Sequence, residues 1–337
     1  MTSVSIEEAL RPSAGLRRRL TASPLTYLSA SLAAMIAVFS VAAPEAFLSA
    51  YNIQTMLTVT SVLLVLSVGM TFVIATAGID LSVGSVLVFS AVMSLRTMTA
   101  LGGSGFGVVL AGFAVAVVSG VVWGTLNGLL VAKAKVPALI STLGTMGAAL
   151  GIAQLVTGGN DLSGVPKALY ETVGLGKLFG VVPWLVVIAL VVTVAGAVVL
   201  NQTKFGRYTL FVGSGAEAAR RSGINVDLHL IKVYGLAGLL AGVAGFLDLA
   251  LFASANIAGH STDNLQAVAA VVLGGTSLFG GVATIPGTVI GVFIPAVLQN
   301  GFVILKVQTF WQEVAIGVVL VLAVYIDQLK RKSREKS

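Results

Sequence analysis

A single carboxylate, Asp80, lies between two long apolar runs in the stretch VIATAGIDLSVGSVLVFSAV, residues 73–92. It is the only acidic residue between Ala46 and Asn160. A charged side chain at membrane depth is costly, so such a residue usually has a specific role. Three roles suit Asp80: a cap for the next helix, an acceptor for substrate hydroxyls, or a titrating site for proton coupling. Its position directly before an apolar helical run favours the cap.

Other chemistries are not supported by the residue types and their spacing. The stretch GLGKLFG, residues 174–180, has Leu178 where a P-loop needs Ser or Thr to bind magnesium. The two histidines, His229 and His260, are expected on opposite sides of a membrane, so no histidine metal site or triad is predicted. The chain has no cysteine, which excludes thiolate ligands. We therefore predict that it is not an enzyme and has no metal or cofactor of its own.

The composition defines the elements that must position Asp80. Of 337 residues, 57% are hydrophobic and 10% are charged, whereas a soluble domain has roughly 25% charged residues. This predicts an all-α, polytopic membrane bundle of about ten transmembrane helices. The predicted spans are 25–43, 56–77, 82–100, 106–131, 136–157, 181–200, 233–253, 264–279, 284–305 and 308–326. The run 265–305 is the hardest to divide, so eight or nine spans remain open.

Lysine and arginine predict the orientation, because positive loops stay in the cytoplasm. Most of the twenty basic residues fall in the N-terminal segment, the loop at 133–135, the loop 201–232 and the C-terminal tail. In the ten-span count these four segments share one side, so both termini are predicted to be cytoplasmic. The segment 1–43 superficially resembles a signal peptide, but the length of its polar start favours a retained first span. The domains expected are a cytoplasmic segment 1–24, a transmembrane domain 25–326 and a basic cytoplasmic tail 327–337.

Small residues and a short repeat predict how the spans pack. Glycines recur every fourth residue at 120–124–128, 147–151, 238–242 and 287–291, a spacing that lets helices approach closely in lipid. The frame G-x-[DS]-L-x-x-G occurs at residues 78–84 and again at 275–281, each time after an apolar run. We expect two pseudo-repeated halves, a common transporter architecture with substrate near the repeat interface.

The connection 201–232 is the longest predicted cytoplasmic loop. Its middle, residues 216–222, contains good helix formers bounded by Gly215 and Gly223, which predicts a short helix in a basic loop. Such a helix is either a solvated connection or the surface on which a cytoplasmic motor acts.

Several ordered motifs together resemble the permease subunits of ribose-type bacterial sugar ABC importers, from about Asn52 to Asp327. These motifs are AGIDLSVGS (77–85), NGLLVAKAKVPALISTLGTM (127–146), FGRY and GSGAEAARRSGIN (205–225), AVAAVVLGGTSLFGG (267–281) and FWQEVAIGVVLVLAVYID (310–327). The chain departs from the family pattern at 264–266, Asn-Leu-Gln, and at 282–284, Val-Ala-Thr. Both departures remove charge near the expected path and leave the sugar unspecified.

The resemblance implies a multi-pass protein of the bacterial inner membrane, acting as a permease homodimer or heterodimer. Its expected partners are a cytoplasmic ATP-binding subunit, which alone binds ATP, and an extracytoplasmic sugar-binding protein. The implied ATPase-coupling residues are Gly215, Ala216, Glu217, Ala218, Ala219, Arg220, Arg221, Ser222 and Gly223. The candidates for the translocation path are Asp80, Ser82, Ser85, Asn127, Thr142, Thr145, Asn264, Gln266, Thr276 and Ser277.

A second function of a different class stays open from the residues alone. An ion- or proton-coupled secondary carrier would use Asp80 as its titrating site, with Asp248 and Glu313 assisting. The scarcity of other central carboxylates weakens this alternative.

Overall fold

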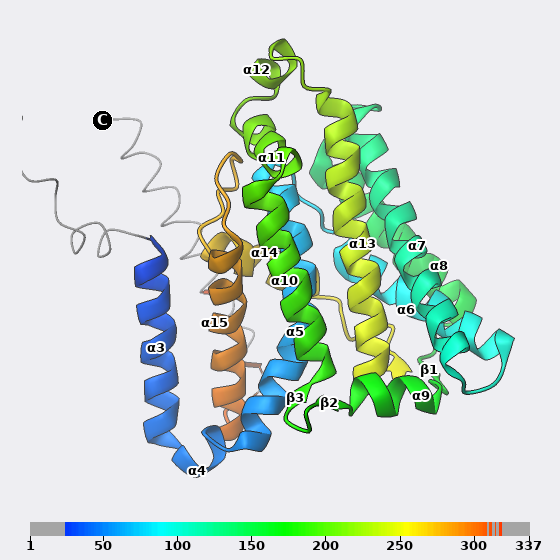
Figure 1. Cartoon of the computed structure of the whole chain (residues 1–337), viewed down its shortest axis with the longest axis vertical. Coiled ribbons are helices and arrows are strands. Elements are labelled where there is room, and N and C mark those ends of the chain that lie inside the picture. Colours follow the sequence, from blue (N-terminus) through cyan, green and yellow to red (C-terminus); the bar gives the residue numbers. More distant parts are fainter. Residues whose placement is uncertain (1–23, 309, 312–313, 315–316, 319–337) are drawn as a thin grey trace, which may run out of the picture.

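The computed structural model describes residues 24–308, 310–311, 314 and 317–318. Thirteen α-helices and a short π-helix make up most of this part of the chain (Figure 1). They are α3 (Pro24–Ala42), α4 (Pro44–Phe47), α5 (Ala50–Ala75), α6 (Val83–Leu101), α7 (Phe106–Ala132), α8 (Ala138–Thr157), α9 (Lys167–Leu169), η1 (Tyr170–Gly174), α10 (Trp184–Gln202), α11 (Lys204–Ser214), α12 (Ala216–Arg221), α13 (Val226–Phe252), α14 (Asp263–Leu273) and α15 (Ile285–Ile304).

Four two-residue strands lie at the end of the bundle opposite to α12 (Figure 1). Strand β1 (Leu162–Ser163) pairs antiparallel with β4 (Ser254–Ala255), and β2 (Lys177–Leu178) pairs with β3 (Val182–Pro183). Below, these two ends of the molecule are called the α12 end and the strand end.

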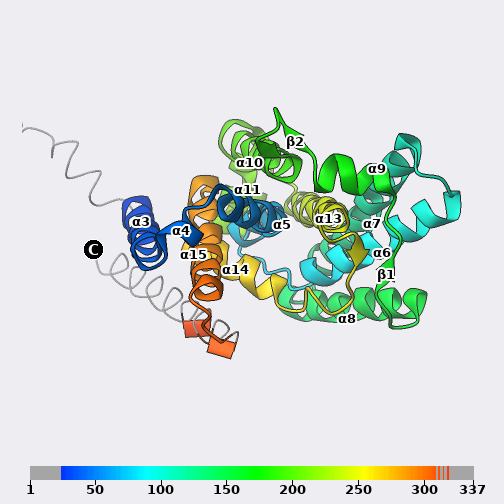
Figure 2. The same cartoon turned by 90° about the horizontal axis from the view of Figure 1, so that it is seen from below.

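Helices α5 and α13 form the centre of the bundle, as the view along its long axis shows (Figure 2). Helix α13 packs against α5, α6 and α7, while α5 also contacts α10, α14 and α15. The sequence of α5 is apolar on all sides, and its residues from Val65 to Ala75 are buried. A helix that is hydrophobic all round suits either lipid or other helices, so its central place is set by the helices that surround it.

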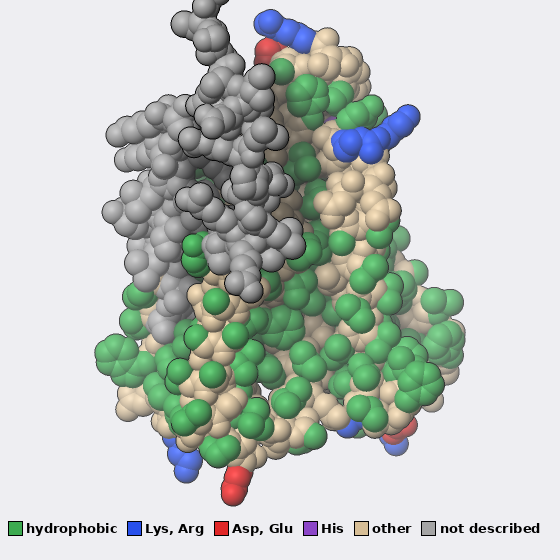
Figure 3. All heavy atoms as spheres, turned by 60° about the vertical axis from the view of Figure 1, so that its left-hand side comes forward, with side chains coloured by type: hydrophobic (Ala, Val, Ile, Leu, Met, Phe, Trp, Pro, Cys, Tyr) green, Lys and Arg blue, Asp and Glu red, His purple; other side chains and the backbone are tan. Residues whose placement is uncertain are grey.

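Eight described helices are long and apolar enough to cross a membrane, so the prediction of a polytopic helical membrane protein is confirmed. On the face drawn in Figure 3, apolar side chains cover the middle of the described surface and the charged ones lie toward its two ends. Without water in the bilayer core, helices satisfy their own backbone groups, and this suits the near absence of strands.

The prediction of a span at 264–279 is wrong. Helix α14 has eleven residues and ends at Leu273, so at 1.5 Å per residue it covers only about half of a hydrocarbon core of roughly 30 Å. Gly275, with a φ of +87°, then turns the chain into a non-helical connection that leads to α15. The predicted span 308–326 falls mostly outside the described residues, as do most of the motif at 310–327, the segment 1–23 and the tail 327–337.

The glycine stripes differ in what they contact. A Cβ atom at Gly120, Gly124 or Gly238 would meet backbone atoms of the facing helix, because α7 and α13 cross in direct backbone contact. Gly291 in α15 packs in the same way against the backbone of Ala270 in α14. The stripe at 147–151 in α8 faces open space, so the spacing alone does not distinguish a packing face from an exposed one.

The connection predicted as a loop at 201–232 is largely helical. The short helix expected in its middle is present as α12, and α11 precedes it. Helix α13 begins at Val226, earlier than the predicted span, because Asn225 caps it by accepting a hydrogen bond from the Leu228 amide at 3.0 Å.

Candidate functional site

Asp80 lies in the break between α5 and α6, and it is buried at 1% exposure. Its Oδ1 accepts hydrogen bonds from the backbone N–H and the hydroxyl of Ser82, at 2.9 and 2.6 Å. Ser82 is the residue directly before the first turn of α6. Asp80 therefore anchors the start of α6 through the amide of Ser82 and does not bond the amides of the first helical turn.

A chain of side-chain hydrogen bonds leads from α8 to Asp80. Thr145 donates its hydroxyl to Oδ1 of Asn127 at 2.6 Å, and Asn127 donates Nδ2–H to the Ser82 hydroxyl at 2.8 Å. Because Ser82 donates in turn to the carboxylate, every donor in this relay points toward the negative charge, and each bond strengthens the next. The Asp80 relay, defined as Asp80, Ser82, Asn127 and Thr145, connects the helix break to α7 and α8.

The backbone carbonyls of the same break are satisfied by three other helices. The carbonyl of Ile79 faces the hydroxyls of Thr142 at 3.4 Å and Tyr234 at 3.5 Å, both at the long limit of a hydrogen bond. Asn264 in α14 donates Nδ2–H to the carbonyl of Leu81 at 3.1 Å. Non-helical backbone at membrane depth needs such partners, so six of the predicted path residues, including Thr142 and Asn264, gather around one helix break.

The other predicted path residues have different surroundings. Ser85, in the first turn of α6, is buried. Thr276 is buried and its hydroxyl has no partner, whereas Ser277 accepts a hydrogen bond from the Phe279 amide at 3.3 Å. Both lie in the connection from α14 to α15, which reaches the end of α5 where the Gly281 amide donates to the Ala75 carbonyl at 3.0 Å. The two copies of the repeated frame thus meet at this end of α5, while the duplication itself stays a prediction.

Helix α12 projects from one end of the bundle (Figure 1). Its Ala219 is fully buried against Val212 and Val226, whereas Ala218 is exposed. Arg220 is held by Asp227, which also pairs with Lys135 at 3.0 Å. The predicted coupling residues therefore present an exposed surface made of Glu217, Ala218 and the two arginines, with Ala219 as the internal contact that fixes it.

A cavity of about 720 Å³ opens in the half of the molecule nearer the strand end. Its walls come from the first part of α5, the end of α13, the connection 253–262, α14 and α15. Of the predicted path residues only Gln266 lines it. The Asp80 relay does not.

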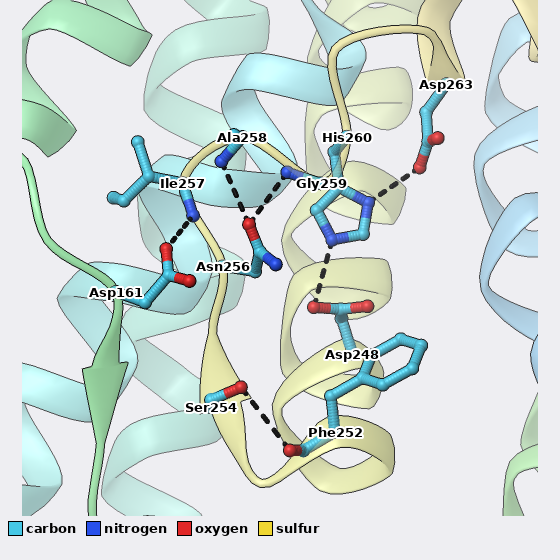
Figure 4. A network of polar contacts seen from close by, with 10 residues as sticks. All are labelled: Asp161, Asp248, Phe252, Ser254, Asn256, Ile257, Ala258, Gly259, His260 and Asp263. Atoms are coloured by element: carbon cyan, nitrogen blue, oxygen red, sulfur yellow. Dashed lines mark hydrogen bonds and ion pairs between the residues drawn. The ribbon is translucent and has the colours of Figure 1, made fainter.

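Two carboxylates and an imidazole form a network in the wall of this cavity (Figure 4). The Nε2 of His260 lies 3.1 Å from Oδ2 of Asp248, and its Nδ1 lies 2.8 Å from Oδ2 of Asp263. Burial by itself lowers the pKa of the ring, but the hydrogen bonds to Asp248 and Asp263 and their charges outweigh it and raise the pKa of His260 to about 10. The ring is therefore protonated at neutral pH and donates to both carboxylates.

The sequence reasoning missed this network. It separated the two histidines by membrane side but did not bring His260 together with Asp248 and Asp263. The available signal was Asp248 itself, the only acidic residue between Val233 and Ser261, which is the same kind of signal that singled out Asp80. Among the described residues, no group of three such side chains has the arrangement of a metal site.

The bundle of membrane-spanning helices contains a helix break lined by buried polar residues, a half-length helix and a cavity with charged and polar groups in its wall. These features define a multi-pass membrane protein of the transporter class. Residues 52–324 match the family described as branched-chain amino acid transport system / permease component, and the chain belongs to this family.

Similar curated proteins are named for sugar transport. The ribose import permease protein RbsC of Escherichia coli is 38% identical over 89% of this chain and 92% of its own length. The xylose transport system permease protein XylH of Haemophilus influenzae is 32% identical over 90% of this chain and 95% of its own. The D-allose transport system permease protein AlsC of Escherichia coli is 32% identical over 89% of this chain and 90% of its own length. No solved structure matches the chain significantly.

Proposed function

We propose that this chain is the transmembrane permease subunit of an ATP-driven importer in a bacterial inner membrane, and that it forms the path for a pentose, a hexose or a related polyol. One observation carries the proposal. Relatives that match about nine-tenths of the chain, and about nine-tenths of their own length, are named as permeases for ribose, xylose and allose.

The proposed partners are a second permease protomer, a cytoplasmic ATP-binding subunit and an extracytoplasmic sugar-binding protein. ATP is bound by the ATPase subunit, and the permease carries no cofactor. The exposed face of α12 supports this assignment, because a short helix held out from the bundle by the Arg220–Asp227 pair offers a rigid element for a motor to push. The motion would reach α13 through Ala219, which packs against Val226 at its start.

In this proposal α12 and both termini are cytoplasmic, residues 25–326 form the transmembrane domain, and the strand end faces the binding protein. The basic residues around α12, including Arg207, Arg220 and Arg221, support this orientation. The Asp80 relay and the residues beside it would border the path between the two ends. A proton-coupled carrier that uses Asp80 is the weaker function, because the relatives are named as permease proteins of import and transport systems and the Asp80 relay lies outside the cavity.

The test replaces the exposed alanine of α12 with a bulky residue. In the purified permease complex, Ala218→Trp should lower capture of the ATPase subunit and ATP-dependent sugar uptake by more than about tenfold, as a side chain too large for a packed interface does. Ala46→Trp, an exposed alanine in α4 near the strand end, is the matched control for ATPase capture. Ala219→Trp is less informative, because Ala219 is buried between α11, α12 and α13, and a bulky residue there would disturb the fold of the permease itself.

Two results would count against the proposal. One is normal capture and uptake with Ala218→Trp. The other is uptake by the wild-type protein that continues without ATP hydrolysis and stops when a protonophore dissipates the proton gradient.

A further inference from the structure

The cavity near the strand end combines charge, neutral polar groups and apolar surface. Its charged residues are Asp248, His260 and Asp263, and no Lys or Arg is among the described residues that line it. Neutral polar groups come from Thr60, Asn256, Thr262, Gln266 and Gln299, and apolar surface comes from residues such as Phe252 and Leu265. A volume of several hundred Å³ with a few convergent polar groups is typical of a small-molecule site.

Asp248 has an unused acceptor. Its side chain is 1% exposed and its Oδ2 is engaged with His260, but its Oδ1 is buried without any hydrogen-bond partner. In Figure 4 the dashed line to His260 reaches one carboxylate oxygen only. A buried charged oxygen without a donor is costly, so a donor that reaches it on ligand binding is stabilising. Asp248 is itself a wall residue of the cavity, so a small shift of this wall on ligand binding brings a ligand hydroxyl to the unused acceptor.

The charge of the network selects the kind of ligand. With His260 protonated, two carboxylates share one positive charge, so the network keeps one net negative charge in a cavity whose described lining holds no Lys or Arg. Such a site accepts hydrogen bonds from hydroxyls and repels an anionic ligand. The side-chain amides of Gln266 and Gln299 can both donate and accept, as a ligand with several hydroxyls requires.

We propose that the cavity with the Asp248–His260–Asp263 network is a binding site of the permease itself for neutral polyhydroxylated solutes, in which Oδ1 of Asp248 accepts a ligand hydroxyl. The inference rests on the proposed function and deepens it, because it assigns the permease a selective site. Neutral sugars bind there and sugar acids are rejected. The His260–Asp263 pair holds Asp248 in place and does not need to contact the ligand.

The test measures sugar binding to the permease without its partners. The full-length chain, purified in lipid nanodiscs, is titrated with D-ribose, D-xylose, D-allose and D-glucose by saturation-transfer difference NMR, which detects millimolar affinities. At least one of these neutral sugars should give a saturable signal. D-Glucuronate, which differs from D-glucose by a carboxylate, should bind more weakly than D-glucose.

Asp248→Asn should weaken binding by about tenfold or more, because the charge-assisted bond is lost while the shape of the side chain is kept. Gln266→Ala should also weaken binding, and it alters no buried charge, so it keeps the test valid if Asp248→Asn does not fold. Glu171→Gln removes an exposed carboxylate outside the cavity and should bind as the wild type does.

The inference is overturned by saturable binding that neither Asp248→Asn nor Gln266→Ala changes, or by equal binding of D-glucuronate and D-glucose. Uptake by the complete wild-type transporter separates the two proposals. Import of a neutral sugar without any binding to the isolated permease refutes the site and leaves the proposed function standing. Absence of both import and binding refutes both.

Discussion

Asp80 and Asp248 are buried carboxylates in apolar surroundings, and they differ in how completely their oxygens are paired. Asp80 ends a relay of donors from Ser82, Asn127 and Thr145 and is outside the cavity. Asp248 lines the cavity and keeps one oxygen without a donor. Since hydrogen bonds stabilise a buried carboxylate and a buried oxygen without a donor costs stability, the first suits a structural role and the second suits a ligand.

Substitutions at Asp80 test this structural role. Asp80→Asn keeps an acceptor oxygen for Ser82, so we expect near-normal expression and uptake above roughly half of the wild-type rate, because the buried donors keep a partner. Asp80→Ala leaves the buried Ser82 amide and hydroxyl without their acceptor and should lower the free energy of unfolding by about 1–3 kcal/mol. Thermal unfolding in detergent and sugar uptake measure both effects. A well-expressed Asp80→Asn protein without transport would instead assign Asp80 to substrate contact. Uptake that no longer depends on pH and no longer accumulates sugar against a gradient would assign Asp80 to proton coupling.

At the scale of elements, α7 and α13 cross with glycines of both helices in the contact. Gly120 and Gly124 in α7 face Gly238 in α13 so closely that a Cβ atom on any of them would meet backbone. In lipid, where the hydrophobic effect does not drive helices together, this close packing is a main source of stability.

Gly238→Ala should therefore separate the two helices and lower the free energy of unfolding by about 1–3 kcal/mol, the usual cost of overpacking. The matched control is Gly147→Ala in α8, where a Cβ atom meets nothing within 4 Å and where alanine improves helix propensity by up to about 1 kcal/mol. Thermal unfolding of both variants in the same detergent gives the comparison. Equal melting temperatures for the two variants would show that the crossing tolerates a methyl group.

At the scale of the whole molecule, the two ends of the bundle are expected to face different compartments. The chain has no cysteine, so single cysteines can be introduced without background. Ser163 in β1 and Ser214 at the end of α11 are both exposed and lie near the strand end and the α12 end, respectively. Ser163 is preferred to the neighbouring Gly164, whose φ of +96° suits glycine only.

In sealed cells, a membrane-impermeant maleimide should label Ser163→Cys and leave Ser214→Cys unlabelled, because the positive residues keep the α12 end in the cytoplasm. Permeabilised cells provide the control, since both cysteines should then react. Labelling of Ser214→Cys from outside would reverse the orientation and with it the assignment of α12 to the ATPase.

The sequence by itself determined that the chain is a polytopic helical membrane protein, and it determined most of its spans, the short helix α12 and the helix break at Asp80. Those features follow from local quantities: hydropathy over about 20 residues, the placement of Lys and Arg, and glycine boundaries. Only the tertiary structure decided that α14 is a half-length helix, because an apolar run has the same composition whether it crosses the membrane or turns back at Gly275. It likewise decided that the glycines at 120–124 pack and those at 147–151 do not, since packing depends on the facing helix. The network of Asp248, His260 and Asp263 arises in the same way: the chain leaves α13, passes through the connection 253–262 and folds back against it, and no local pattern specifies that return.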